Sequence, residues 1–181
     1  MKNSILNKVT PDEALEILHR LAKKNPGMIK EIETEAELLL KKIDIKKIVD
    51  DVHSVLNGLD VEELWDRSGS HRDGYSSPED QAVEMMEEAL EPYNDEVIRY
   101  LDFGMLPEAK VYCMGVLKGI YQYEQESKSN SKDWFADIPA ECFGYLLTKW
   151  KKRTTDRVDL KEMNDFLKTE CSRWSSWALK N

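Results

Sequence analysis

The sequence is poor in the residues that make turns and in the residue that crosslinks a chain. Its 181 residues include only eight Gly, six Pro and three Cys. A fold with many short strands needs frequent turns rich in Gly and Pro, so this composition argues against an all-β protein. A chain of this length buries roughly 70% of the surface that its unfolded form exposes. We therefore expect a globular protein that needs neither a disulfide nor a metal to fold.

Long apolar runs and an excess of positive charge are also missing. No apolar run reaches the roughly 18 residues of a membrane-spanning helix, and the first residues lack the apolar segment of a secretion signal. The formal net charge is −9, whereas binding to a phosphate backbone depends on Lys and Arg. We therefore expect neither a membrane nor a nucleic acid as the partner. The most basic stretch, 149–157 (KWKKRTTDR), is typical of the cationic end of a helix, and a nucleic-acid-associated regulator is the alternative that it would support.

The three cysteines, at positions 113, 142 and 171, are too far apart for the close pairs of a zinc site. Each lies among apolar residues, where a free Cys behaves as a small hydrophobic side chain. This pattern predicts buried, reduced thiols and a cytoplasmic location.

Helix-forming residues dominate the remaining composition. The clearest segment is 106–126 (LPEAKVYCMGVLKGIYQYEQE), which has a Pro in its first turn and apolar residues that spread beyond one helical face. We predict that this segment is the buried central helix of an all-α fold. Gly115 and Gly119 lie one turn apart, so they leave a shallow groove where a neighbouring helix can approach closely. The predicted buried face consists of Ala109, Cys113, Val116, Leu117 and Ile120.

Hydrophobic periodicity and capping residues predict eight or nine helices in antiparallel hairpins, arranged as a helical-repeat-like superhelix or an irregular bundle. Pro92 is expected to break a helix, because proline removes a backbone hydrogen bond. The polar stretch 127–133 predicts a linker. We therefore divide the chain into 1–126 and a C-terminal helical pair, 127–181, packed on the first part. Besides 106–126, the predicted helices cover about 11–24, 26–42, 44–56, 61–67, 78–91, 95–101, 139–152 and 160–174.

The polar stretch 68–76 (SGSHRDGYS) is the first candidate functional site, because polar loops on a rigid scaffold often carry function. It contains the tripeptide His-Arg-Asp of the kinase catalytic loop, but the Gly-rich loop, the strand Lys and the Asp-Phe-Gly motif of kinases are missing. The alternative is a plain surface turn. The candidate binding residues in and beside this loop are Trp65, Arg67, His71, Arg72, Asp73 and Tyr75.

A row of acidic residues follows the loop. Glu84, Glu87, Glu88 and Glu91 have the spacing of one helical face, opposite the apolar residues of the same segment. A ferritin-like di-iron site needs inward Glu residues and Glu-x-x-His pairs, and no His lies three positions after a Glu here. We therefore expect a solvated face without metal or cofactor, and we add Glu84, Glu87 and Glu88 to the candidate binding surface.

The region 14–123 resembles the helical region of SWIM zinc-finger proteins. The matching features are Leu18-x-x-Leu21-Ala22-x-x-Asn25-Pro26, the segments 44–56 and 75–90, and Gly115-Val116-Leu117-Lys118-Gly119-Ile120-Tyr121. The resemblance implies a HEAT- or TPR-like helical scaffold that serves as an interaction module. The SWIM zinc motif, Cys-x-Cys followed by Cys-x-His, is absent, so the resemblance implies no zinc site and no catalytic residue.

Together these patterns favour a non-catalytic protein-interaction module whose partner is another protein. The candidate surface combines the loop 68–76 with the acidic face at 84–91. A small-ligand-binding protein or an enzyme with a pocket between helices is the alternative, and Tyr112, Tyr121, Tyr123 and Trp65 would line that pocket.

Overall fold

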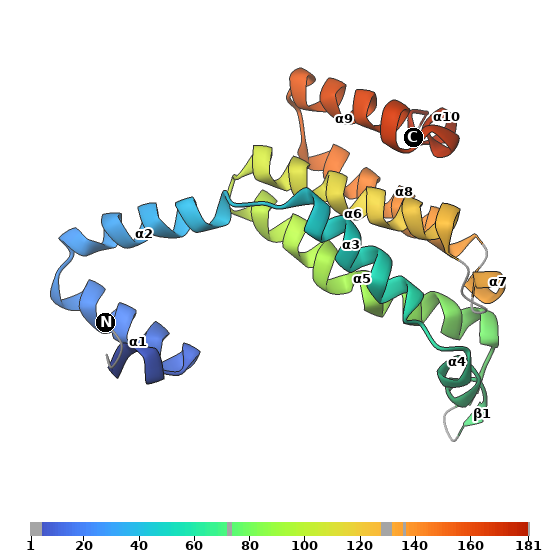
Figure 1. Ribbon diagram of the computed structural model, residues 1–181, viewed down its shortest axis with the longest axis horizontal. Coiled ribbons are helices and arrows are strands. Elements are labelled where there is room, and N and C mark those ends of the chain that lie inside the picture. Colours follow the sequence, from blue (N-terminus) through green and yellow to red (C-terminus); the bar gives the residue numbers. More distant parts are fainter. Residues whose placement is uncertain (1–4, 72–73, 128–131, 136, 181) are drawn as a thin grey trace. The chain divides into compact units, whose positions relative to one another are not determined.

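The computed structural model describes residues 5–71, 74–127, 132–135 and 137–180 (Figure 1). The protein is all-α, as predicted, and in the described ranges the only strands form one short hairpin, β1 (Gly69–His71) with β2 (Gly74–Ser76). A 3₁₀ turn, Ile5–Lys8, precedes the first α-helix. The α-helices are α1 (Pro11–Lys24), α2 (Gly27–Leu40), α3 (Ile45–Asn57), α4 (Val61–Arg67), α5 (Pro78–Asp102), α6 (Leu106–Glu126), α7 (Lys132–Phe135), α8 (Ile138–Arg153), α9 (Arg157–Glu170) and α10 (Ser172–Ala178).

The chain forms two compact units, 1–42 and 43–181. The division therefore falls at 42/43 and not at the 126/127 boundary that the polar stretch suggested. Helices α8, α9 and α10 belong to the second unit, where α8 packs on α5 and α6 and α9 packs on α6. The predicted linker 127–133 lies mostly outside the described residues, but Ser127 is anchored, because its hydroxyl donates a hydrogen bond of 2.6 Å to Asn57 Oδ1 on α3.

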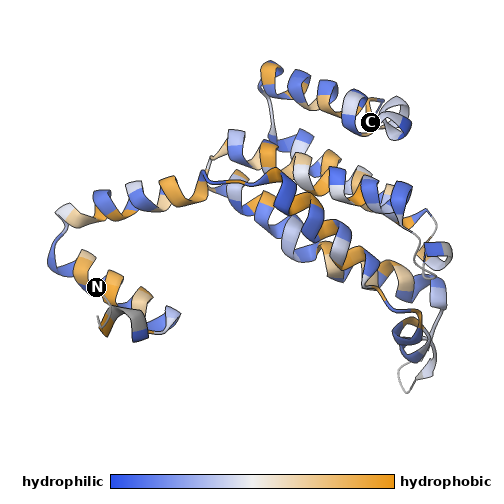
Figure 2. Cartoon of the chain, viewed as in Figure 1, coloured by the Kyte–Doolittle hydropathy of each residue, from blue (hydrophilic) through white to orange (hydrophobic). Residues whose placement is uncertain are grey.

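The first unit contains α1 and α2, which contact each other. Helix α1 begins with the predicted capping box, in which the Thr10 hydroxyl accepts from the Glu13 backbone N–H and the Glu13 carboxylate accepts from the Thr10 backbone N–H. Both helices carry the expected apolar residues (Figure 2). No side chain of either helix is buried, however, and Leu15 and Leu39 are 54% and 66% exposed.

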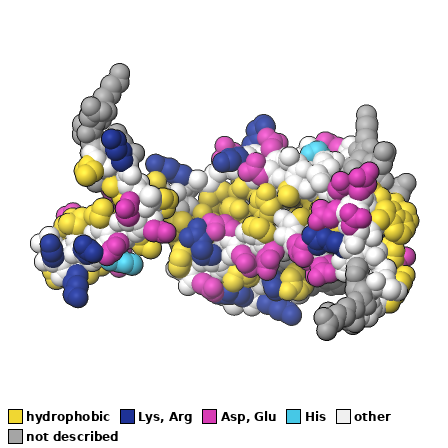
Figure 3. Space-filling view, turned by 90° about the horizontal axis from the view of Figure 1, so that it is seen from below, with side chains coloured by type: hydrophobic (Ala, Val, Ile, Leu, Met, Phe, Trp, Pro, Cys, Tyr) yellow, Lys and Arg dark blue, Asp and Glu magenta, His cyan; other side chains and the backbone are white. Residues whose placement is uncertain are grey.

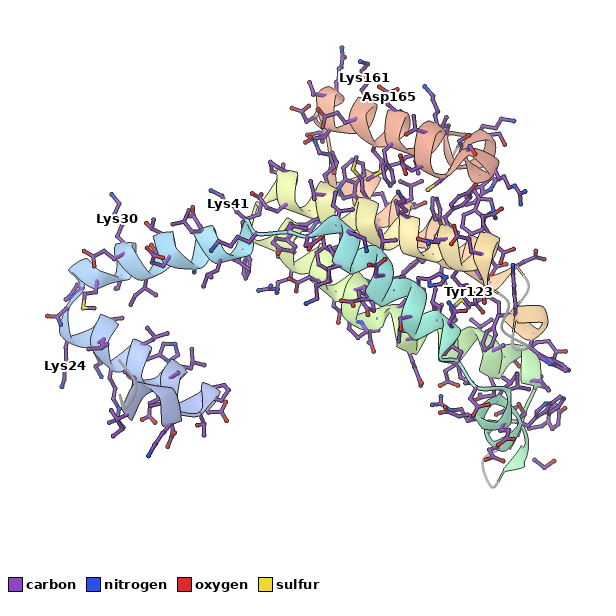
Figure 4. The ribbon with its side chains drawn as sticks, viewed as in Figure 1. Lys24, Lys30, Lys41, Tyr123, Lys161 and Asp165 are labelled. Carbon is purple, nitrogen blue, oxygen red and sulfur yellow. The ribbon has the colours of Figure 1, made fainter. Side chains whose placement is uncertain are left out.

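The core of the second unit surrounds α6. All five side chains of the predicted buried face have no exposed surface. Helices α3, α5, α8 and α9 pack against α6, and Figure 1 shows α3, α5, α6 and α8 running side by side. Tyr123, near the end of α6, is also fully buried in this bundle (Figure 4). The central helix was therefore predicted correctly, with its bounds.

The predicted close helix approach is confirmed at α3. A Cβ atom placed on Gly119 would lie 2.6 Å from Val52 Cβ, and one placed on Gly115 would lie 2.9 Å from Ile48 Cγ2. Both distances are too short for carbon atoms in contact, so a side chain at either position would force α3 or its side chains to shift. The glycine pair therefore fixes how closely α3 lies on the central helix.

Three local predictions were wrong. Helix α5 runs through Pro92 without a break, although an interior proline costs about 3 kcal/mol. Leu90 before the proline and Val97 after it are fully buried, so packing on both sides holds the helix together. The last predicted helix is two helices, because α9 ends before Cys171 and α10 follows it. The stretch 68–76 is not a plain loop but contains the β1–β2 hairpin, in which His71 pairs with Gly74.

Candidate functional site

A groove of about 540 Å³ lies between α5 and α8 in the second unit. The first wall is the acidic face of α5, including all three Glu residues predicted for the binding surface. Helix α8 supplies the second wall. The lining residues are Val83, Glu84, Glu87, Glu88, Glu91, Asn94 and Asp95 on α5, and Ile138, Glu141, Cys142, Tyr145 and Lys149 on α8.

The periodicity of each helix explains why these residues line the groove. On α5 the core-facing side is taken by Ala82, Met86 and Leu90, which are fully buried, so the glutamates between them face away from the core. On α8 the lining residues are three, four, seven and eleven positions after Ile138, which defines a second stripe beside the buried one. The spacing of that stripe is present in the sequence, but it was not predicted, because the apolar residues of α8 indicated only its core face.

Negative charge dominates the groove. The described lining residues include six carboxylates, from Glu84, Glu87, Glu88, Glu91, Asp95 and Glu141, and a single amine, that of Lys149. The Lys149 Nζ atom lies 4.2 Å from the centre of the Tyr145 ring, a cation–π contact within α8. Carboxylates held together with so little positive charge attract cations from solution.

Arg67 at the end of α4 joins this surface. Its guanidinium forms ion pairs of 2.7 Å with both Glu88 on α5 and Glu63 on α4. These contacts raise the pKa of Arg67, and they bring two of the predicted binding residues, Arg67 and Glu88, into direct contact.

Cys142 is the one thiol among the lining residues described. Burial, and after it the nearby charges of Glu87 and Glu141, raise the pKa of this thiol to about 11. A thiol with this pKa is protonated at neutral pH and is a poor nucleophile. Cys142 is only partly buried, unlike Cys113 and Cys171, so the prediction of three buried thiols was wrong for this residue.

Of the other predicted site residues, the described ones are not among the residues that line the groove. Trp65 packs edge-to-face on Trp134 of α7 with ring centres 5.0 Å apart, and the two residues are 49% and 43% exposed. Tyr75 on β2 is 71% exposed. His71 is the last residue of β1, and Arg72 and Asp73 lie outside the described residues. The structure thus brings Arg67 to Glu88, one of the predicted glutamates, and it places neither Trp65 nor Tyr75 among the lining residues of the groove.

The aromatic residues expected around an inter-helix pocket do not form one. Tyr123 is fully buried, Tyr121 packs on Trp174 of α10, and Tyr112 packs on Tyr100 of α5. These three side chains lie at different helix contacts, and neither they nor Trp65 line the groove between α5 and α8.

The basic stretch 149–157 includes the end of α8, where its cations serve the fold. Lys151 Nζ donates a hydrogen bond of 2.9 Å to the Ala178 carbonyl oxygen, and Arg153 forms an ion pair of 2.8 Å with Asp102. These contacts agree with the interpretation of this stretch as the cationic end of a helix.

Searches for other kinds of site and for similar proteins gave no match. Within the described ranges no group of three or more His, Cys, Asp or Glu residues could hold a metal ion. None of the helices in the described part of the chain has the length and apolar character needed to cross a membrane. No protein-family model, curated protein or solved structure matches the chain. The resemblance to the helical region of SWIM proteins therefore stays a prediction.

Proposed function

We propose that this protein is a non-catalytic interaction module and that the groove between α5 and α8 binds a segment of another protein rich in Lys and Arg. The observation that carries this proposal is the charge of the groove, six carboxylates against one amine. Opposite charges on two partners steer their encounter and select against wrong partners. An acidic groove therefore favours a basic segment.

Apolar side chains in the groove support a protein segment rather than a simple ion. Val83 and Ile138 are among the lining residues, and both are partly exposed. The methylene stems of Lys and Arg pack on such apolar surface while their charged ends reach carboxylates. A basic segment can thus bury apolar and charged groups in the same groove.

The ion pairs at Arg67 define where a partner would bind most strongly. Glu88 is already paired with Arg67 at 2.7 Å, so part of its charge is neutralised within the protein. Among the residues that the structure describes, Glu84, Glu87 and Glu141 form no ion pair, and we assign these three carboxylates of the groove to the partner's cations.

The alternatives receive less support from the same geometry. An enzyme would need an activated group in the groove, whereas the raised pKa of Cys142 keeps its thiol protonated. A nucleic acid would bring its phosphates against the carboxylates. We also propose a cytoplasmic location, which the free thiols of Cys113, Cys142 and Cys171 support.

The test is a selection of peptides from a random library on the full chain, followed by affinity measurements on the selected peptides. We expect the selected peptides to be rich in Lys and Arg, and we expect the triple variant Glu84→Gln/Glu87→Gln/Glu141→Gln to bind them at least about tenfold more weakly, a loss of about 1.4 kcal/mol. Binding should also weaken as the salt concentration rises.

A matched control removes the same charge elsewhere. The variant Glu31→Gln/Glu33→Gln/Glu35→Gln changes three exposed glutamates of α2 and should leave the affinity unchanged. Selection of neutral or acidic peptides, or equal losses in the two triple variants, would contradict the proposal. A thermal-shift screen of metabolites tests the small-ligand alternative, since a ligand at a hundred times its Kd stabilises by about 2.7 kcal/mol.

A further inference from the structure

Tyr145 presents an aromatic ring in the acidic groove between α5 and α8. It is the only aromatic residue among the lining residues that the structure describes, and it is 56% exposed. The face of an aromatic ring carries partial negative charge and attracts cations. On the face of the protein drawn in Figure 3, hydrophobic side chains, which include Tyr, likewise reach the surface beside carboxylates. The groove thus combines an exposed ring with acidic side chains.

The cation that lies on this ring belongs to the protein itself. The Lys149 amine is 4.2 Å from the centre of the Tyr145 ring, one helical turn further along α8. Among the residues that the structure describes, Lys149 forms no ion pair, although six carboxylates line the same groove. The single amine of the lining is therefore held by the ring and not by a carboxylate, which identifies the ring as a place where the groove holds a cation.

Carboxylates of α5 lie at a similar level to the ring on the other wall. Helices α5 and α8 run in the same direction (Figure 1), and at their ends Asp102 of α5 pairs with Arg153 of α8 at 2.8 Å. Tyr145 is eight positions before Arg153, and Asp95 is seven positions before Asp102. Because both helices rise by about 1.5 Å per residue, these two residues are nearly level. Glu91, one turn before Asp95, also lines the groove.

We propose that the Tyr145 ring is the subsite of this groove for an arginine of the partner segment, and that this arginine displaces the Lys149 amine from the ring. A guanidinium is planar and stacks on an aromatic face, while the donors at its edge stay available for carboxylates. An ammonium is a compact and strongly hydrated charge. An arginine on the ring can therefore bond to carboxylates of α5 at the same time, and the site selects Arg over Lys.

Lys149 acts as an internal competitor of the partner. Its side chain is half-buried and flexible, so its amine can leave the ring without a change in the backbone. A partner must displace this amine, and the displacement lowers the affinity of every segment. A segment with an arginine at this point compensates for the loss, whereas one without it does not. Contacts that weaken the binding of wrong partners in this way increase specificity.

This inference rests on the proposed function, because it concerns which residue of a basic segment binds at one point of the groove. The proposed function requires only that basic peptides bind to the acidic groove. The inference requires in addition that an arginine binds through the Tyr145 ring. Experiments on the ring and on the peptide side chain therefore test the second statement separately from the first.

The test is isothermal titration calorimetry of the full chain with two synthetic peptides of equal length and equal charge. One peptide has Arg as its only kind of basic residue, and the other has Lys at the same positions. We expect the natural chain to bind the Arg peptide at least about twofold more tightly. Tyr145→Leu should remove this preference but still bind both peptides, whereas Tyr145→Phe, which keeps an aromatic face, should retain it.

Variants of Lys149 separate the ring contact from net charge. Lys149→Met should raise the affinity for the Arg peptide about two- to fivefold, since it vacates the ring. The gain should be smaller in the Tyr145→Leu background, where there is no ring to vacate. The matched control Lys152→Met removes the same charge at an exposed position of α8 outside the described lining. Its effect should be small and the same in both backgrounds.

The outcomes distinguish this inference from the proposed function. Equal affinities for the two peptides, or a preference for Arg that survives Tyr145→Leu, would overturn the inference and leave the proposed function intact. A gain from Lys149→Met that is equal in both backgrounds would do the same, because it would be an effect of charge alone. If neither peptide binds to the natural chain, the proposed function fails and the inference fails with it.

Discussion

Helices α1 and α6 have similar sequence patterns and very different surroundings. Each has a proline in its first turn and an apolar face at helical spacing. Eight residues of α6 are buried, whereas no residue of α1 is, because α3, α5, α8 and α9 all pack on α6. The comparison shows that periodicity predicts the presence of an apolar face but does not say what covers it.

The largest expected difference between the two units is in the effect of replacing a leucine by alanine. Leu117→Ala removes a fully buried side chain of α6 and should lower the free energy of unfolding by about 2–5 kcal/mol, since it leaves a cavity. Leu39→Ala removes a side chain of α2 that is 66% exposed, and we expect a change within about 0.5 kcal/mol. Urea denaturation followed by circular dichroism measures both. Equal losses would show that the leucine of the first unit is buried in solution.

A smaller effect is expected from adding a methyl group to a glycine. Gly119→Ala should lower the free energy of unfolding by about 1–3 kcal/mol, because the new Cβ would lie 2.6 Å from Val52 Cβ and 3.1 Å from the Val49 carbonyl oxygen. Gly27→Ala, at the start of α2, meets no atom within 4 Å and should stabilise by about 0.4–1 kcal/mol. The same denaturation experiment measures both changes in the free energy of unfolding, which should have opposite signs. A stabilised Gly119→Ala variant would mean that α3 lies further from α6.

Breaking an ion pair should also lower the free energy of unfolding more in the second unit than in the first. The Lys110 amine of α6 donates a hydrogen bond of 2.6 Å to Asp159 and also contacts Glu162, and its side chain is 11% exposed. Lys110→Met should lower the free energy of unfolding by about 1–2 kcal/mol, since it leaves the Asp159 carboxylate without this partner. Lys41→Met breaks a pair with Glu37 whose side chains are more than half exposed, and it should change stability by less than about 0.5 kcal/mol.

The contribution of Lys110 should depend on pH. Burial lowers the pKa of Lys110, but the hydrogen bonds to Asp159 and Glu162 outweigh this effect, so the pKa lies above its ordinary value of 10.5. A group whose pKa rises on folding stabilises the protein fully below its unfolded pKa. The difference between the natural chain and Lys110→Met should therefore be constant at neutral pH and shrink as the pH rises above 10.5. A difference that grows at alkaline pH would contradict this assignment.

Local signals in the sequence predicted the helices well. The capping box at Thr10 and the apolar spacing of α6 involve residues a few positions apart, so they are readable without the fold. Helix α5 differs because buried contacts of Leu90 and Val97 with distant segments override the local effect of Pro92. The break at Cys171 also lacks a Gly or Pro that would mark it. Tertiary packing decides these features, and a single sequence does not display it.

Only one wall of the candidate site could be predicted, because the other wall also depends on tertiary packing. The spacing of Glu84, Glu87 and Glu88 predicted an acidic face of α5, and the structure places all three in the groove. The second wall comes from α8, more than forty residues further along the chain. Only the packing of α8 on α5 brings Glu141 and Cys142 to that face, so the groove itself could not be predicted from either helix.

The smallest expected effect concerns one carboxylate in each region. Glu87→Gln should lower the pKa of Cys142, because the Glu87 charge helps to keep this thiol protonated. The shift should be a small part of the total, since burial is the larger cause and remains unchanged. Glu35→Gln makes the same substitution on α2, in the first unit, and should leave the pKa of Cys142 where it is. Alkylation of the folded protein with iodoacetamide at a series of pH values measures this pKa, because Cys113 and Cys171 are fully buried and react slowly. If Glu35→Gln shifted the pKa of Cys142 as much as Glu87→Gln, the thiol would be responding to the net charge of the chain. That outcome would contradict a local effect of the groove carboxylates on Cys142.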